Sequence, residues 1–363
     1  MRNLLNNKGG SIMRGHIALI ALLAGVASMG SSEAQAAENA GGWYALGTKA
    51  SMSGFVPPPG TYFIDVNYFY EGNATGASAV GVALRDIGPA NIQGHLLIET
   101  KSKVNAKVYY NLPSFLWVAP SKVLGGNVGF GAIVPFGSKD VGFDLDALAT
   151  LSLGPPINRT FKRGQSVHVD DSSTDFGDPV FNTIIGWHEG NWHWNVNALV
   201  NVPIGPWSKS SSSNLSFNHW GLATIAAVTW LDPNIGFEVS VAPGFTFNWE
   251  NPDTDYKTGT EFHVELALLQ HVSPRFAVGV AGFHYQQVTG DSGAGAVLGN
   301  FKGRVTALGP VATYNFNLGK IPVSTQLTWM HEFDVENRLE GDIGIFTISF
   351  PLSGSGPAPV SLE

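Results

Sequence analysis

The sequence predicts an all-β protein, a transmembrane antiparallel up-and-down β-barrel of about 12 strands. Three observations predict this fold. The chain begins with an export signal, long segments alternate apolar and polar residues with period two, and short turns alternate with long polar connections. Short turns on one side of the membrane and long loops on the other are typical of bacterial outer-membrane barrels.

The N-terminal region has the three parts of a secretory signal peptide. Basic residues precede an apolar run, and Ala34-Gln35-Ala36 follows as an A-x-A cleavage signal. The alternative is a single membrane anchor, but the apolar run is shorter than the roughly 20 residues that a spanning helix needs. We therefore predict a signal peptide over 1–36, cleaved after Ala36.

Residues 37–59 have few strand signals. They contain Trp43, Tyr44 and Phe55, which are large enough to be buried. The segment is expected either to remain periplasmic as a leader or to fold into the lumen as a plug.

From residue 60 the sequence contains twelve candidate strands. Their approximate ranges are 61–70, 94–110, 123–136, 176–188, 192–204, 219–231, 235–250, 259–271, 275–288, 301–316, 320–333 and 342–351. Turn-forming residues make tight connections at 189–191, 232–234, 272–274 and 317–319, and 111–122 is a longer member of this set. The alternate connections 71–93, 137–175, 205–218, 251–258, 289–300 and 334–341 are expected to be loops. The barrel is predicted over 60–352, with a tail at 353–363.

The hairpin 219–251 carries the clearest alternation. Its second strand places Phe237, Val239, Val241, Phe245 and Phe247 on one face, with small or polar residues between them. A soluble β-sandwich also alternates, but its wet face would carry many Lys and Glu. Here that face carries mainly Asn, Ser, Thr and Gly, which suits a confined lumen. The tryptophans expected at the membrane girdles are Trp192, Trp220, Trp230 and Trp249.

Composition limits the partners. The chain has no cysteine, a formal net charge of −8 and only 13% charged residues. Disulfides and thiol chemistry are excluded, and an acidic chain without a basic run argues against nucleic acid. The expected partners are outer-membrane lipid, a small apolar or aromatic solute, and the barrel-assembly machinery during biogenesis. The expected state is a monomer in the outer membrane of a Gram-negative bacterium, without cofactor or bound metal.

Charged residues on the expected lumen faces of several strands define a candidate solute path. They are Lys101, Lys103, Lys107, Glu238, Glu261, His263, Glu265, Arg304 and Glu332. Opposed charges on different walls would order water and filter solutes by polarity. The alternative is that these groups pair and rigidify the barrel. An apolar strip is expected in the same lumen at Ala223, Ile225, Phe283 and Tyr285, with Phe63 and Phe69 as further inward aromatics.

Two clusters have a second interpretation. Glu261, His263 and Glu265 share one strand face and would suit metal binding or acid–base chemistry, although no recognisable nucleophile accompanies them. Asp170, Asp171, Asp175 and Asp178 would suit Ca²⁺, but their spacing does not match an EF-hand loop. We expect neither a metal site nor catalysis, and a solvated acidic loop at 170–178.

Several motifs in order resemble the phenol-degradation meta-pathway family, also described as SphA-like outer-membrane transporters. They are Pro57-Pro58-Pro59-Gly60-x-Tyr62, Phe176-Gly177-Asp178-Pro179, Thr289-Gly290-Asp291-Ser292-Gly293, Ala307-Leu308-Gly309-Pro310 and Glu332-Phe333-Asp334-x-x-Asn337-Arg338-x-x-Gly341. The resemblance covers nearly the whole mature chain. It implies an outer-membrane barrel that admits aromatic or other hydrophobic compounds. The tail after Phe350 departs from a typical barrel end.

The predicted function is therefore a non-enzymatic outer-membrane channel for passive uptake of small hydrophobic or aromatic compounds. One alternative is an outer-membrane lipid hydrolase, for which His219 beside Ser216 is the nearest candidate pair. Another is a structural or surface-binding barrel that uses the 137–175 connection.

Overall fold

The structure, a computed structural model, describes residues 41–87, 92–296 and 299–354. The predicted signal peptide and nearly all of the predicted tail lie outside the described residues. Among these residues, 74–104 and 142–170 form one compact unit, and the rest form a second unit that contains the barrel. In the described part of the chain, no helix is long and apolar enough to cross a membrane.

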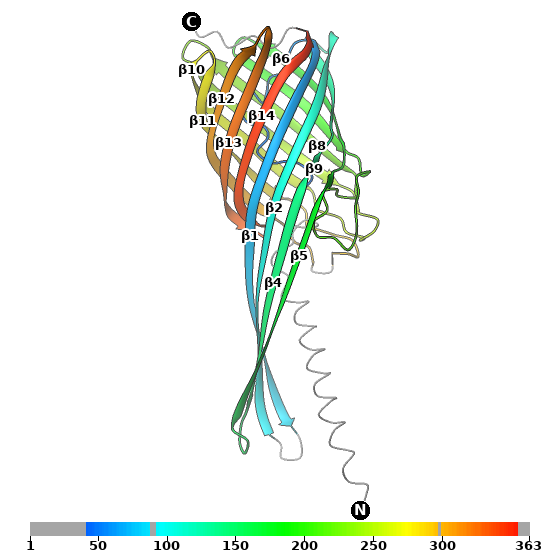
Figure 1. The fold of residues 1–363 in the computed structure, drawn as a ribbon, viewed down its shortest axis with the longest axis vertical. Helices are drawn as coiled ribbons and strands as arrows, with labels where there is room; N and C mark the ends of the chain where they lie inside the picture. The colour runs from blue at the N-terminus through cyan, green and yellow to red at the C-terminus, as the bar shows by residue number, and fades with distance from the viewer. Residues whose placement is uncertain (1–40, 88–91, 297–298, 355–363) are drawn as a thin grey trace, which may run out of the picture. The chain divides into compact units, whose positions relative to one another are not determined.

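The described residues form fourteen strands (Figure 1). They are β1 (Gly60–Ile87), β2 (Ile92–Val123), β3 (Gly126–Ile133), β4 (Phe136–Leu153), β5 (Arg159–Phe176), β6 (Val180–Glu189), β7 (Trp192–Asn201), β8 (Gly221–Asp232), β9 (Phe237–Asn248), β10 (Glu261–Ser273), β11 (Phe276–Gln287), β12 (Arg304–Leu318), β13 (Ile321–Glu336) and β14 (Glu340–Gly354).

Twelve of these strands close an antiparallel barrel. The order around it is β1, β14, β13, β12, β11, β10, β9, β8, β7, β6, β3 and β2, and β2 pairs again with β1. The first and last strands meet in a long ladder, from Gly60 opposite Gly354 to Asn73 opposite Glu340. Closure removes the unpaired sheet edges that a membrane would not tolerate. The predicted fold class and strand number are confirmed, and each predicted strand overlaps one of the twelve.

Three of the predicted connections are wrong. Residues 71–87 and 92–93 belong to β1 and β2, 111–122 continues β2, and most of 137–175 forms β4 and β5. In the sheet, β4 lies next to β2, and β5 lies next to β4. The unit made of 74–104 and 142–170 has its own buried cluster of Leu96, Ile98 and Ala149. Nearly every residue of β5 is exposed, so no apolar alternation marks it in the sequence.

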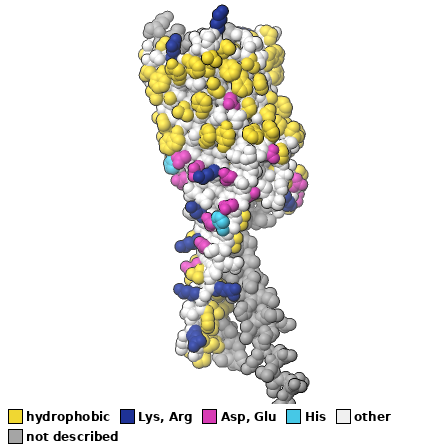
Figure 2. Space-filling model, viewed as in Figure 1, with side chains coloured by type: hydrophobic (Ala, Val, Ile, Leu, Met, Phe, Trp, Pro, Cys, Tyr) yellow, Lys and Arg dark blue, Asp and Glu magenta, His cyan; other side chains and the backbone are white. Residues whose placement is uncertain are grey.

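The outer face of the barrel is apolar. Val241, Phe245 and Phe247 of β9 are exposed, whereas Glu238 and Ser240 on the opposite face of the same strand are buried. On the face drawn in Figure 2, apolar side chains cover the barrel strands. About half of the surface of three girdle candidates, Trp192, Trp220 and Trp249, is exposed, and Trp230 lies beside Trp192 in the ladder. A continuous apolar exterior of this kind fits a lipid environment.

The barrel interior is partly filled by the chain's own N-terminal part. Tyr44 and Leu46 are buried in one cluster with inward side chains of β8 and β11, including Ile225 and Phe283. The inner wall in contact with these residues is therefore packed rather than wet, and the free space lies elsewhere in the barrel.

Candidate functional site

We call residues 41–59 the inner segment. Its first half is fixed by Glu265 of β10, which is buried. The Tyr44 hydroxyl donates to Glu265 Oε1, and the Lys49 backbone N–H donates to Glu265 Oε2 at 2.9 Å. The Tyr44 ring also stacks on His263, with 4.2 Å between ring centroids. A buried carboxylate is tolerated when hydrogen bonds compensate its charge, and here the inner segment supplies them.

A second carboxylate, Glu238 of β9, fixes the middle of the inner segment. Its Oε1 accepts hydrogen bonds from the Met52 N–H at 2.7 Å and the Ser240 hydroxyl at 2.8 Å. Its Oε2 accepts from the Ser51 hydroxyl at 3.0 Å and lies 2.8 Å from His271 Nε2. Hydrogen bonds to charged groups contribute about 1.5–3 kcal/mol each, so this carboxylate is a strong anchor.

The end of the inner segment packs directly on the wall. The Gly54 N–H donates to Thr229 Oγ1 at 2.9 Å, and the Ser53 carbonyl accepts from Asn195 Nδ2 at 2.8 Å. A Cβ atom at position 54 would lie 2.4 Å from the His193 carbonyl oxygen. Only glycine permits this approach of backbone to backbone.

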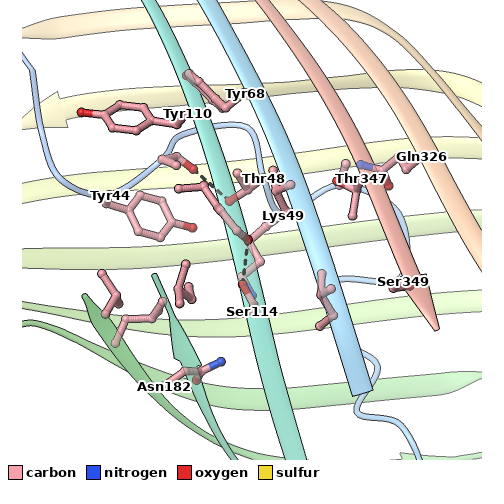
Figure 3. Close-up of a pocket in the computed structure, with 18 of the residues that line it drawn as sticks. Tyr44, Thr48, Lys49, Tyr68, Tyr110, Ser114, Asn182, Gln326, Thr347 and Ser349 are labelled. Carbon is pink, nitrogen blue, oxygen red and sulfur yellow. Dashed lines mark hydrogen bonds between the residues drawn. The ribbon is translucent and has the colours of Figure 1, made fainter. Parts of the chain in front are cut away.

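A cavity of about 820 Å³ borders the inner segment on its other side (Figure 3). The wall around the cavity is contributed mainly by β1, β2, β3, β6, β7, β13 and β14. Six tyrosines line the cavity, together with apolar side chains such as Ile64, Val66 and Leu116. These tyrosines are Tyr44, Tyr62, Tyr68, Tyr70, Tyr110 and Tyr285. A largely apolar cavity with a few polar groups is the usual form of a small-molecule site.

Charged side chains of both signs also line the cavity, among them Lys49, Arg338, Glu261 and Glu332. The guanidinium carbon of Arg338 lies 4.3 Å from the centroid of the Tyr285 ring, a cation–π arrangement. Burial lowers the pKa of the Lys49 ammonium, and the nearby Glu265 opposes this effect. The lysine therefore loses its charge at a lower pH than an exposed lysine does.

Five of the charged residues predicted for the solute path lie inside the barrel, and they form two groups. Glu261, His263 and Glu332 line the cavity, whereas Glu238 and Glu265 are covered by the inner segment that they hold. In the predicted apolar strip, Tyr285 lines the cavity, while the other three members are buried in the cluster that contains Tyr44. These three are Ala223, Ile225 and Phe283.

Four of the predicted lumen charges are wrong. Lys107 points to the outer face and pairs with Glu71 at 2.9 Å, because Ala106, Val108 and Tyr110 occupy the inward positions of β2. Lys101 and Lys103 are exposed and belong to the other compact unit. Arg304 lies at the start of β12, half-buried, beside Asp334 and Glu336 at 3.3 and 3.5 Å.

Two predicted inward aromatics also face outward. Phe69 is exposed, and Phe63, two positions along the same face from Asp65, is half-buried and contacts the exposed Phe115 and the half-buried Phe350. The alternate residues of β1, including Tyr68 and Tyr70, line the cavity instead. The sequence offered a signal for them, since strand 61–70 carries large aromatics on both faces and its tyrosines bring hydroxyls suited to the inside.

The Glu261, His263 and Glu265 cluster is distributed among different partners. Glu261 accepts from the Tyr285 hydroxyl at 3.0 Å, and His263 Nδ1 lies 3.9 Å from Glu265 Oε1. Among the described residues, no group of three or more His, Cys, Asp or Glu side chains has the geometry of a metal site. The cluster belongs to the cavity wall and to the anchor of the inner segment.

The acidic residues near 170–178 hold loops. Asp171 Oδ2 accepts from the Ser211 hydroxyl at 2.8 Å and from the Ser212 N–H at 2.7 Å. Hydrogen bonds from the Ser211 side chain and from the backbone lower the pKa of Asp171 to about 2. Asp178 binds the Gly205 N–H at 3.0 Å in the same loop region. At Asp171 and Asp178, the oxygens that would coordinate a cation therefore serve the 205–217 connection.

The candidate hydrolase pair is engaged with backbone groups. Ser216 Oγ donates to the Phe176 carbonyl at 3.5 Å, and His219 Nδ1 lies 3.0 Å from the Trp220 carbonyl oxygen. Both side chains are buried. This arrangement gives the serine no visible activation by the histidine.

A protein family described as the putative MetA-pathway of phenol degradation matches residues 72–348. The chain belongs to this family. This match confirms, over most of the barrel, the family resemblance that the ordered motifs indicated. No curated protein matches the sequence.

One solved structure supports the fold of this MetA-pathway family member. An outer membrane channel from Pseudomonas putida F1 is similar with a TM-score of 0.54 at 13% sequence identity, covering 84% of this chain and 98% of that one. A Pseudomonas aeruginosa FadL homologue covers 80% of this chain and 89% of its own, at 9% identity and a TM-score of 0.35. At such identities the first likeness supports the fold.

Proposed function

We propose that the protein is a channel through which small hydrophobic or aromatic molecules enter by passive diffusion. The observation that carries this proposal is the cavity of about 820 Å³ between the inner segment and the wall. Its tyrosines offer ring faces and hydroxyls to a flat solute, and each favourable ring pair contributes about 0.5–1.5 kcal/mol. Membership in a family described by phenol degradation supports an aromatic solute.

In this proposal the barrel lies in the outer membrane of a Gram-negative bacterium as a monomer, surrounded by lipid. Export would use the signal peptide 1–36, and the barrel-assembly machinery would insert the chain. The apolar exterior with its exposed tryptophans supports this location, because such a surface would aggregate in water. No step of the proposal requires a cofactor or enzymatic chemistry.

The inner segment acts in this proposal as a plug that narrows the lumen without filling it. Glu265 and Glu238 hold it against β9 and β10, and the cavity remains on the side of β1 and β2. A solute would pass beside the segment, between Tyr44 on one side and Tyr68 or Tyr110 on the other.

Liposome swelling and planar-bilayer conductance test the proposal. The purified mature chain in liposomes is expected to admit phenol-like solutes faster than sugars of similar mass, after subtraction of the flux into protein-free liposomes. Equal rates for both classes would reduce the protein to a general pore. A lack of permeation by either class would contradict transport.

A further inference from the structure

The acidic side chains around the cavity already have hydrogen-bond donors from the protein. The pairs are Tyr285 Oη to Glu261 Oε1 at 3.0 Å, Tyr70 Oη to Glu332 Oε2 at 3.1 Å, and the Phe217 N–H to Asp178 Oδ2 at 2.8 Å. Each acidic group is therefore tied to the wall by a neutral donor. A ligand with donors, such as an amine, would have to compete with these contacts.

The cationic side chains around the same cavity differ from the acids. Arg338 Nη1 is buried without a hydrogen-bond partner. Within the described residues, no hydrogen bond or ion pair of the structure involves Lys49 Nζ, and both oxygens of the nearby Glu265 bind Tyr44 and the Lys49 backbone. Among the charged groups of the cavity, the free hydrogen-bonding capacity therefore belongs to the cations, which call for an acceptor. Neutral buried atoms without a partner, such as Asn182 Oδ1 and Asn197 Nδ2, add both acceptors and donors to the lining.

The charge of the lining points the same way. Lys49, Lys139, Arg275 and Arg338 line the cavity, against the carboxylates Asp178, Glu261 and Glu332. This excess of cations stands in a chain whose formal net charge is −8. The lining of the cavity therefore departs in sign from the protein as a whole, which favours anions locally, while the buried carboxylates Glu238 and Glu265 are engaged by the inner segment.

The position of Lys49 places a charged group beside the tyrosine rings, so the cavity offers both a ring-binding part and an anion-binding part. It lies on the inner segment, and Figure 3 shows it in the cavity with Tyr44, Tyr68 and Tyr110. A flat ring placed among these tyrosines would bring a short acidic substituent to the ammonium. An apolar molecule alone would use the rings and offer no acceptor to Lys49 Nζ or Arg338 Nη1. The compensation of their charges would then come from Glu265 for the lysine and from Glu261, Glu332 and the Tyr285 ring for the arginine.

We propose that the channel selects aromatic carboxylates, single-ring monoanions of the benzoate type, and that Lys49 binds the carboxylate while the ring lies among the tyrosines. Arg338 offers a second position for the anion along the cavity. This inference rests on the proposed function and names its solute class. Lys49 carries three donors on a flexible stem, so it can follow a carboxylate that moves past it.

The test uses the full mature chain in planar bilayers and liposomes, with benzoate and its neutral analogue benzyl alcohol as probes. Lys49→Met removes the charge at nearly constant length, and Lys49→Arg keeps it. Lys107→Met is the matched control, because Lys107 lies on the outer face beside Glu71. Heat-modifiable gel migration checks that each variant is folded.

Loss of one charge-assisted contact is expected to raise the half-saturating benzoate concentration about tenfold in Lys49→Met. The ratio of benzoate to benzyl alcohol flux should fall with it, while Lys49→Arg and Lys107→Met retain the wild-type ratio. An unchanged ratio and an unchanged benzoate concentration in Lys49→Met would overturn this inference alone. If neither probe crosses the wild-type channel, the proposed function fails as well.

Discussion

At the scale of single residues, Glu265 is the side chain that most directly joins the inner segment to the barrel. Replacing it with alanine leaves the Tyr44 hydroxyl and the Lys49 N–H without an acceptor, at a cost of about 1–3 kcal/mol for each buried donor. We expect Glu265→Ala to loosen residues 41–59, which would raise single-channel conductance and the rate of proteolysis within them. The exposed Glu250→Ala serves as control. Wild-type conductance and proteolysis in Glu265→Ala would contradict this role.

Lys49 gives the channel an expected pH dependence. Burial lowers the pKa of its ammonium, and the groups that face it are Glu265, which stabilises the charge, and His263 and Tyr44 beside that carboxylate. Only the charged form binds a carboxylate, so benzoate affinity is present at pH values where benzoate is ionised and Lys49 is still protonated, and it is lost as pH rises through this lowered pKa. Benzoate titrations at increasing pH check this loss of affinity. The loss should begin at a lower pH than the pH at which an exposed lysine loses its charge. Lys49→Arg should lose no affinity over that range.

Period-two alternation placed Glu238, Glu261, His263, Glu265 and Glu332 correctly on inward faces, because their strands pass through the apolar belt. The same rule failed for Lys107 on β2. There the outer face meets Glu71 and not lipid, and the inner face is apolar and aromatic. The rule that polar residues face inward holds only where lipid covers the outside. Lys49 had no pattern to mark it, since the inner segment belongs to no sheet.

At the scale of elements, the inner segment depends on one close approach. A Cβ atom on Gly54 would lie 2.4 Å from both the His193 carbonyl oxygen and the Thr229 nitrogen. Gly54→Ala is therefore expected to lift the end of the segment from β7 and β8 and to raise conductance, while the barrel ladder stays intact. Gly344→Ala is the matched control in β14, because its Cβ would meet its nearest neighbour at 3.8 Å. Equal conductance of the two variants would show that the segment tolerates the methyl group.

The strands of the barrel could be predicted because one face of each meets lipid, which imposes apolar residues at every second position. β4 and β5 could not. Their unit, 74–104 with 142–170, buries only a small cluster around Ile98, and most of its side chains are exposed. Where both faces of a strand meet water, the sequence has no reason to alternate, and a polar strand has the composition of a loop.

At the scale of the whole molecule, the chain adapts to three environments. The exterior of the barrel is apolar, the interior buries carboxylates that hold the inner segment, and the cavity combines tyrosines with cations. Composition averages over all three environments, which is why the formal net charge of −8 does not predict the sign of the cavity. Assigning a solute class therefore required the contacts of individual side chains.

Because the chain forms two compact units, permeation through the barrel can be tested apart from a binding function of the other unit. Every residue that lines the cavity belongs to the unit that contains the barrel. Glu71 and Lys107 are paired at 2.9 Å, so β1 and β2 can be rejoined there by a short turn, and a second turn can join 141 to 171. We expect deletion of 74–104 and 142–170 to leave a heat-modifiable barrel that admits benzyl alcohol at the wild-type rate. Loss of permeation in a barrel that still folds would show that the deleted unit takes part in the solute path. A binding function would then no longer be sufficient to explain why the chain contains this unit.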